Sequence, residues 1–183
     1  PQSMFERVLG AVTLPRVEEI DPQRFWPSSR SVAFRREAWE TAGGYPEWLD
    51  YCEDLLFDFS LRDAGFRFWF TPRAVAYFRP RNNLRGFLKQ YYRYARGDGK
   101  ADFWRYRHLI RYATYLVALP ALVVLTVAHH PGWLLPLAAG GAATLWSPLR
   151  RLRPWLKGFP VAFRLRMLAW LPLIRWGGDL AKM

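Results

Sequence analysis

The sequence contains a single cysteine, Cys52, among 183 residues. One cysteine excludes an intramolecular disulfide and cannot by itself build a cysteine-rich zinc site. Acidic residues are also scarce, since 15 Asp and Glu stand against 27 Lys and Arg. The resulting net charge of +12 predicts an anionic partner, which is either a nucleic acid or the surface of a membrane.

Residues 112–147 contain no Asp, Glu, Lys or Arg. This long uncharged segment decides between nucleic acid and membrane as the partner. Residues 112–128 form an uncharged run at the short end of the roughly 17–25 residues that cross a bilayer as a helix. Residues 133–146 form a shorter apolar run, which could cross the bilayer only together with the residues on either side of it. Basic residues cluster on both sides, at 105–111 and 150–157, which is a pattern typical of membrane proteins and predicts membrane lipids as partners.

The loop at residues 129–132 is short enough to join the two apolar runs into a transmembrane helical hairpin over residues 105–148. Because Arg and Lys lie at both outer ends and not in the turn, we expect both ends to face the cytoplasm. The second run is also compatible with a buried core helix or a re-entrant segment. Residues 149–183 are predicted to be a basic juxtamembrane and amphipathic interfacial segment, with four residues facing lipid: Phe163, Leu168, Trp170 and Leu171.

Residues 1–104 have the mixed composition of a globular domain. Three short runs rich in β-branched and aromatic residues predict strands at residues 31–34, 67–70 and 74–78. Three helices are expected between and after them, over residues 36–42, 53–64 and 82–97. Glycines at 43, 65 and 97 are the predicted stops, and Asp50 is expected to cap the second helix.

Two groups of polar side chains on these helices are suited to chemistry. Asp54 and Asp58 are four residues apart and share a helix face, where Asp58 can pair with Arg62. The structural alternative is that Glu53 and Asp54 are acids favoured in a first turn by the helix dipole.

On the third helix a polar stripe lies beside the apolar one, at Gln90, Arg93, Tyr94 and Gly97. In this stripe Arg93 has the geometry to hold a phosphate bidentately. The alternative is a solvated face that carries surplus basic charge.

Six short motifs follow one another in this half of the chain: Ala33–Trp39, Gly43–Tyr45, Glu53–Asp54, Gly65–Arg67, Pro72–Ala74 and Gln90–Tyr94. Their order resembles that of the family-two inverting glycosyltransferases over residues 28–104. The resemblance implies an α/β fold of the GT-A type around a mixed sheet, of which residues 1–104 are the acceptor-side part.

The same resemblance implies the transfer of a sugar, with inversion, from a nucleotide-sugar donor to a hydroxyl of a glycan or lipid-linked acceptor. It assigns the role of catalytic base to Asp54, with Glu53 as its neighbour. The residues that it implies in binding the acceptor or the donor phosphates are Gly44, Tyr45, Gln90, Arg93 and Tyr94.

Two departures from the family pattern limit what the resemblance implies. Tyr94 stands where processive members have tryptophan, so a single sugar addition is as compatible with the sequence as polymerisation. No Asp-x-Asp occurs, although in the family this motif binds the metal on the donor phosphates. We therefore expect the donor half, and most ligands of a Mg²⁺ or Mn²⁺ ion, to lie before Pro1, which would make this chain a fragment.

A different class of function also fits the composition. A non-catalytic module rich in basic and aromatic residues can bind nucleic acid by stacking bases beside phosphate contacts, or can anchor a protein to a membrane. The apolar hairpin argues against nucleic acid as the partner. The sequence therefore favours a membrane-associated glycosyltransferase.

Overall fold

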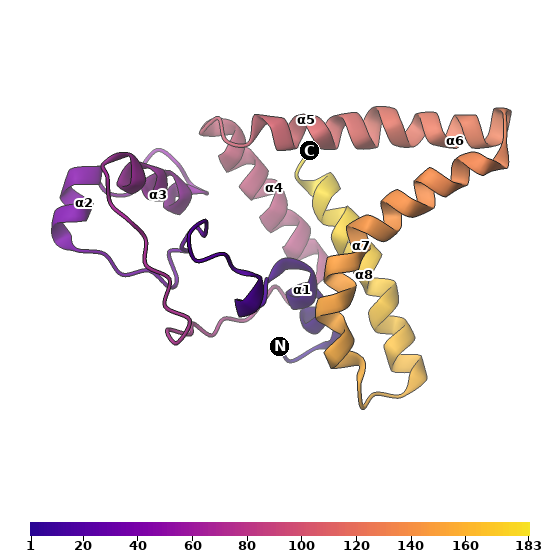
Figure 1. The fold of residues 1–183 in the computed structure, drawn as a ribbon, viewed down its shortest axis with the longest axis horizontal. Coiled ribbons are helices and arrows are strands. Elements are labelled where there is room, and N and C mark those ends of the chain that lie inside the picture. The colour runs from indigo at the N-terminus through magenta and orange to yellow at the C-terminus, as the bar shows by residue number, and fades with distance from the viewer. The chain divides into compact units, whose positions relative to one another are not determined.

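The computed structural model describes all 183 residues, and every regular element in it is a helix (Figure 1). The α-helices are α1 (Met4–Thr13), α2 (Arg36–Ala42), α3 (Glu53–Asp63), α4 (Leu84–Lys100), α5 (Arg105–Tyr112), α6 (Leu119–Ala128), α7 (Leu134–Leu156) and α8 (Val161–Ala181). The shorter elements are η1 (Val17–Glu19), η2 (Ala113–Ala118) and η3 (Pro131–Trp133), of which η2 is a π-helix.

The predicted α/β fold with a mixed sheet is wrong, because the chain forms no β-strand. A strand needs a neighbour to complete its backbone hydrogen bonds, and the three runs expected as strands do not pair with one another. Their side chains are not sheet-like either, since Trp69 is 89% exposed and Tyr77 is 95% exposed. These runs are therefore irregular segments, and helices alone build the fold.

The chain divides into two compact units. Unit 1 contains Pro1–Leu14, Arg79–Tyr92 and Trp104–Met183, and unit 2 contains Pro15–Phe78 and Arg93–Phe103. Helix α4 contributes its first half to unit 1 and its second half to unit 2. The bounds of these units do not coincide with the predicted boundaries at residues 104 and 148. The predicted division separates the chain by function, and it stays a prediction.

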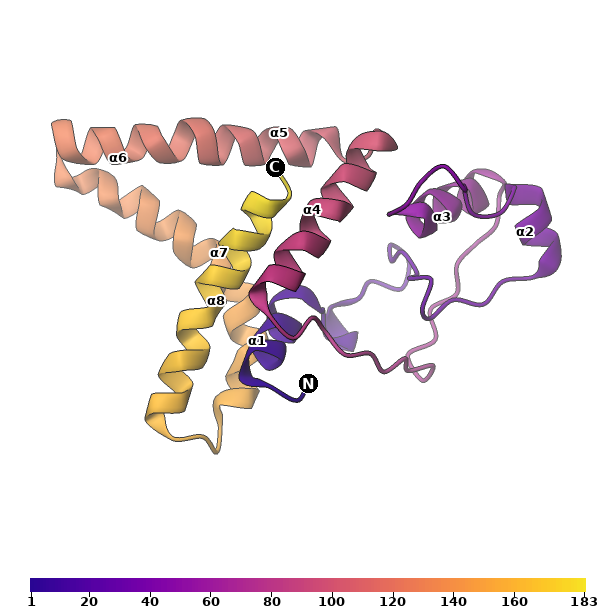
Figure 2. The same ribbon diagram turned by 180° about the vertical axis from the view of Figure 1, so that it is seen from behind.

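The core of unit 1 forms where α1 packs against α7 and α8 (Figures 1 and 2). Apolar residues recur along α1 at intervals of three and four, which gives the helix one apolar stripe. The side chains buried in this core are Phe5, Val8, Leu9, Ala11, Phe87, Leu152, Met167, Leu171 and Ile174. Glu6 is also buried, and its carboxylate is neutralised by Arg79 at 2.7 Å, so the pKa of Glu6 falls to about 2.

One face of helix α8 packs into this core, although the sequence predicted that the apolar side chains of this segment face lipid. Leu171 is only 3% exposed, and the ring of Trp170 meets that of Phe5 edge to face at 5.1 Å. Phe163 and Leu168 also pack against the buried cluster. The sequence pattern showed an apolar face correctly, but α1 covers that face.

The first half of α4 joins the same core through Phe87. A Cβ at Gly178 of α8 would lie 2.9 Å from Phe87 Cζ, so the absence of a side chain there lets the two helices approach. At the start of α4, Asn83 Oδ1 accepts the Gly86 N–H at 2.7 Å, which confirms the predicted beginning of this helix. The predicted stop at Gly97 is wrong, because α4 continues to Lys100.

Helices α5, η2 and α6 form one continuous rod from Arg105 to Ala128 (Figure 1). The rod is the one helix in the chain that is long and apolar enough to cross a membrane, with a mean hydropathy of 1.8 and no buried part in its apolar window. Its π-helical turn lies just before Pro120, which lacks the N–H that Leu116 would otherwise bind. Length and composition thus support one membrane-spanning helix.

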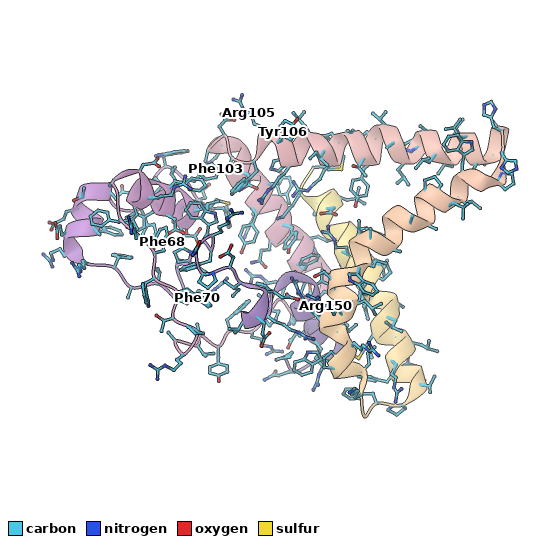
Figure 3. The ribbon with its side chains drawn as sticks, in the orientation of Figure 1. Phe68, Phe70, Phe103, Arg105, Tyr106 and Arg150 are labelled. Atoms are coloured by element: carbon cyan, nitrogen blue, oxygen red, sulfur yellow. The ribbon has the colours of Figure 1, made fainter.

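The rod is fixed to α8 at its base by Asp179. The Asp179 carboxylate accepts hydrogen bonds from Tyr115 Oη at 3.2 Å and from Arg175 at 3.0 Å, and it lies 3.8 Å from Arg111 Nε. After the rod the chain turns through η3 and returns in α7, which carries Arg150 in its second half (Figure 3). Since α7 does not qualify as a second span, the hairpin over residues 105–148 stays a prediction.

Unit 2 is built around the packing of α2 on α3, which buries Ala38, Phe57 and Leu61. Helix α2 has the predicted bounds, and α3 begins at the predicted Glu53 but ends at Asp63, one residue before the predicted end. Gly43 ends α2 with a φ of 80°, and Gly65 follows α3 with a φ of 89°. Glycine favours this left-handed conformation because it has no Cβ.

Candidate active site at the start of helix α3

Asp54 lies in the first turn of α3, where two backbone N–H groups orient its carboxylate. Leu55 N–H donates to Asp54 Oδ1 at 2.9 Å, and Ser29 N–H donates to Asp54 Oδ2 at 3.4 Å. Each oxygen keeps a further lone pair, because a carboxylate has about four acceptor positions. The side chain is partly exposed. Asp54 is therefore held in place while its oxygens keep positions open for a further hydrogen-bond donor.

The predicted cap of α3 by Asp50 is wrong. The residue at the N-cap position is Cys52, which has a left-handed φ of 66° and makes no side-chain cap. The Asp50 carboxylate instead lies 3.2 Å from Lys100 Nζ and 3.7 Å from Arg96 Nη2 on α4. These two cations draw the carboxylate away from the start of α3.

Asp58 is a buried carboxyl on the inner face of α3. It is 3% exposed, and its Oδ2 has no hydrogen-bond partner. Burial, helped by the negative charge of Asp54, raises the pKa of Asp58 to about 7. At neutral pH the protonated and ionised forms of Asp58 are therefore both populated.

The predicted pair between Asp58 and Arg62 does not form. The Arg62 guanidinium lies over the rings of Trp26 and Phe59, at 4.7 Å and 5.4 Å from their centroids. Sequence reasoning also missed that Asp58 is buried. The signal was its place beside Phe57 and three residues before Leu61, on the apolar side of the helix.

Tyr45 packs on α3, the helix that carries the three carboxyl groups of this site, because its ring lies 4.7 Å from that of Phe57. Its pKa is raised by burial first and then by the negative charges of Asp54, Asp58 and Glu53. The Tyr45 hydroxyl therefore keeps its proton at neutral pH and can donate a hydrogen bond. Tyr45 therefore packs on the same helix whose first turn carries Glu53 and Asp54.

Gly44 positions Tyr45 through the backbone. It has a φ of 72°, and a Cβ there would lie 2.7 Å from Cζ2 of Trp39. Only glycine lets the chain turn so tightly over the Trp39 ring. The Tyr45 ring then packs at 5.2 Å from Trp39 and 4.7 Å from Phe57.

The predicted motif Arg93–Tyr94 contacts the turn at Tyr51 and Cys52, which leads into the predicted motif Glu53–Asp54. The Arg93 guanidinium lies 5.3 Å from the centroid of the Tyr51 ring, and the Cys52 thiol donates to the Tyr94 carbonyl at 3.5 Å. Since Cys52 directly precedes Glu53, unit 2 brings the acidic motif and Arg93–Tyr94 together. Gln90 lies outside this group, in the first half of α4, where its Oε1 accepts from Arg81 Nε at 3.2 Å.

Aromatic rings cover the outer side of α3, and the sequence reasoning did not assign them to the site. The Phe59 ring meets those of Trp26 and Phe103 edge to face, at 4.7 Å and 5.1 Å. Phe68 and Phe70, which are labelled in Figure 3, come from a run predicted as a strand. Their rings pack on that of Phe25. These contacts attach the irregular segments of unit 2 to the helix that carries Asp54.

The acidic residues do not form a metal site. No group of three or more His, Cys, Asp and Glu side chains lies close enough together to hold a metal ion. No ligand of the expected Mg²⁺ or Mn²⁺ is assigned to this chain, and the ion stays a prediction for the complete protein.

Comparison with known proteins finds a relative of the chain. The chain is similar to succinoglycan biosynthesis protein ExoA of Rhizobium meliloti (strain 1021). The two are 30% identical over 148 residues, which cover 74% of this chain and 43% of the relative, so the chain spans less than half of the relative's length. No family model matches the chain, and no solved structure matches it.

Replacing Asp58 with asparagine should make the stability of unit 2 less dependent on pH. The pKa of Asp58 rises from 3.8 to about 7 on folding, so the folded state keeps a proton that the unfolded state releases. Stability should therefore fall as pH rises from about 4 to about 7, by on the order of 1–3 kcal/mol. Thermal unfolding at pH 5 and pH 8 measures this loss, which Asp58→Asn should reduce.

Asp63→Asn is the matched control, because Asp63 is an exposed carboxylate on the same helix. It should leave the pH dependence of the wild-type chain unchanged. An equal loss of melting temperature between pH 5 and pH 8 in wild type and Asp58→Asn would show that Asp58 is not its origin.

Proposed function

We propose that the chain is part of a glycosyltransferase that moves a sugar, with inversion, from a nucleotide-sugar donor to an acceptor hydroxyl in glycan synthesis at a membrane. The observation that carries the proposal is the joining of Glu53–Asp54 and Arg93–Tyr94 within unit 2. The similarity to a protein of succinoglycan biosynthesis supports it. The substrates and the activity belong to the complete protein.

In this proposal Asp54 is the general base. Backbone N–H groups of Leu55 and Ser29 fix the orientation of its carboxylate and leave acceptor positions open. As the acceptor oxygen attacks the anomeric carbon, Asp54 takes the proton from that hydroxyl and the nucleoside diphosphate leaves. One displacement inverts the anomeric configuration. The Tyr45 hydroxyl, which keeps its proton, donates a hydrogen bond to the acceptor beside Gly44.

Arg93 is proposed to bind the donor diphosphate. Its guanidinium lies against Tyr51, so one face of the group is packed while its N–H donors lie in the plane of the group and can grip a phosphate. Tyr94, on the same helix, is a further proposed phosphate contact, and the role of Gln90 in binding phosphate stays a prediction from the sequence. A Mg²⁺ or Mn²⁺ ion is proposed for the complete protein alone.

The substitution Asp54→Asn should abolish most sugar transfer in the complete protein while leaving its fold intact. Asparagine keeps the size and the hydrogen-bond acceptor but loses the basicity, and general-base assistance is worth about 10²–10⁴-fold in rate. Sugar transfer and thermal unfolding should be measured together, with Asp63→Asn as the control. If Asp54 only favours the helix start, its loss should cost about 0.3–1 kcal/mol and leave turnover nearly intact.

The substitution Arg93→Lys tests the phosphate role against the packing role. A lysine keeps a cation for the Tyr51 ring but cannot reproduce the bidentate grip of a guanidinium. We expect turnover to fall by about 10–100-fold, the equivalent of one strong charged hydrogen bond. Arg85→Lys, an exposed change on the same helix, should have little effect. Wild-type turnover in Arg93→Lys would reduce Arg93 to a packing residue.

We also propose that both ends of the segment 105–148 face the cytoplasm, because basic residues lie at both ends and none lies in the turn. Single cysteines introduced as His129→Cys and Arg151→Cys, in a Cys52→Ser background, should label from opposite sides of the membrane. Labelling of both positions from one side would contradict this topology and would leave the rod from Arg105 to Ala128 as the sole span.

A further inference from the structure

Helix α4 approaches the turn before Glu53 so closely that no side chain fits between them. A Cβ at Gly97 would lie 2.4 Å from the Tyr51 carbonyl oxygen, 2.9 Å from the Tyr51 carbonyl carbon and 3.1 Å from Cys52 Sγ. Gly97 itself has no positive φ, so the helix geometry does not require a glycine. Alanine is favoured over glycine in a helix interior by about 1 kcal/mol. The close approach is therefore the feature that requires Gly97.

Other contacts hold the same turn against α4. The Cys52 sulfur lies 3.5 Å from the Tyr94 carbonyl oxygen and 3.4 Å from Asp98 Oδ1, and these two oxygens share its single S–H donor. The Asp50 carboxylate lies 3.2 Å from Lys100 Nζ at the end of the helix. Cys52 also keeps a left-handed backbone that is uncommon for residues other than glycine, and such a conformation persists where the surroundings hold it.

We propose that the contact of Gly97 with Tyr51 and Cys52, here called the Gly97 joint, sets the position of Asp54 relative to Arg93. Gly97 and Cys52 are then positioning residues, because they act through Asp54 and do not touch the substrates. Cys52 is two residues before Asp54, and Gly97 is one helical turn after Arg93. A fixed contact between Cys52 and Gly97 therefore limits how far Asp54 can move relative to Arg93. This inference rests on the proposed function.

The size of the expected effect follows from how sensitive catalysis is to placement. A misplacement of about 1 Å in a reacting group can cost about 10²-fold in rate. The Tyr51 oxygen would have to move by a similar amount to accommodate a Cβ at Gly97. A single methyl group on α4 should therefore disturb Asp54, although Gly97 carries no functional group.

Cys52 provides a direct reporter for the joint, since it is the only cysteine of the chain. Burial, followed by the negative charge of Asp98, raises the pKa of the Cys52 thiol to about 12. The thiolate is the form that reacts with alkylating reagents, so Cys52 should label very slowly in the closed joint. Opening the joint should speed up this labelling.

The first experiment compares Gly97→Ala with Gly99→Ala in residues 1–183. Gly99 lies on the same helix, and a Cβ there would meet nothing within 4 Å, so it is a matched control. We expect maleimide labelling of Cys52 to be at least about tenfold faster in Gly97→Ala and unchanged in Gly99→Ala. Circular dichroism should show retained helix in both. Wild-type labelling in Gly97→Ala, or equal acceleration in both variants, would overturn the joint.

Asp50→Asn covers the case in which Gly97→Ala does not fold. It adds no atoms but removes the attraction to Lys100 and Arg96, so labelling of Cys52 should be a few times faster. If Gly97→Ala is unfolded and Asp50→Asn labels at the wild-type rate, the joint is overturned.

The second experiment tests positioning by a double-mutant cycle in the complete protein, assayed well below the melting temperature. Gly97→Ala alone should lower kcat by about 10²-fold. Added to Asp54→Asn it should cost much less, because the base that it misplaces is already lost. A general structural defect would multiply the two losses, and that outcome would overturn the positioning role. Normal turnover of Asp54→Asn would refute the proposed function instead, while the labelling result would still stand.

Discussion

The candidate site depends on a backbone-to-backbone contact between α4 and the Tyr51 carbonyl, which exists because Gly97 has no side chain. Helix α3 begins without a side-chain cap, so its first turn is held by this contact and by the tertiary hydrogen bonds around it. The acidic motif therefore takes its position from α4 more than from its own helix. Gly44 serves a similar purpose for Tyr45, because its lack of a side chain lets the Tyr45 ring pack against Trp39 and against Phe57 of α3.

Local signals in the sequence predicted the helices of unit 2 well. Glycine at 43 and 65 ended α2 and α3 for the predicted reason, since both adopt a left-handed backbone. The strands failed because β-propensity is mostly a preference for packing on a sheet, and it has little effect without a partner strand. The aromatic residues of 67–70 that favoured a strand pack instead against other rings.

The site was predictable only in part, for a related reason. The order of motifs pointed to Tyr45, Asp54 and Arg93, and the fold places all three in unit 2. The burial of Asp58 and the contact of Cys52 with Asp98 depend on residues that are distant in the sequence or on another face. Periodicity describes one helix at a time, so it cannot show which residue of α4 must be small for α3 to fit.

The attachment of Asp179 to Arg111, Arg175 and Tyr115 has a mechanical consequence for unit 1. A free apolar rod adjusts to a thinner or thicker bilayer by tilting about its end. Here the base of the rod is bonded to α8, and α8 is packed on α1 and on the first half of α4. Tilting the rod would therefore strain a packed helical core. A freely hinged rod would respond to a change in bilayer thickness by changing its angle. We expect that in this protein the same change would instead strain the packed core of unit 1.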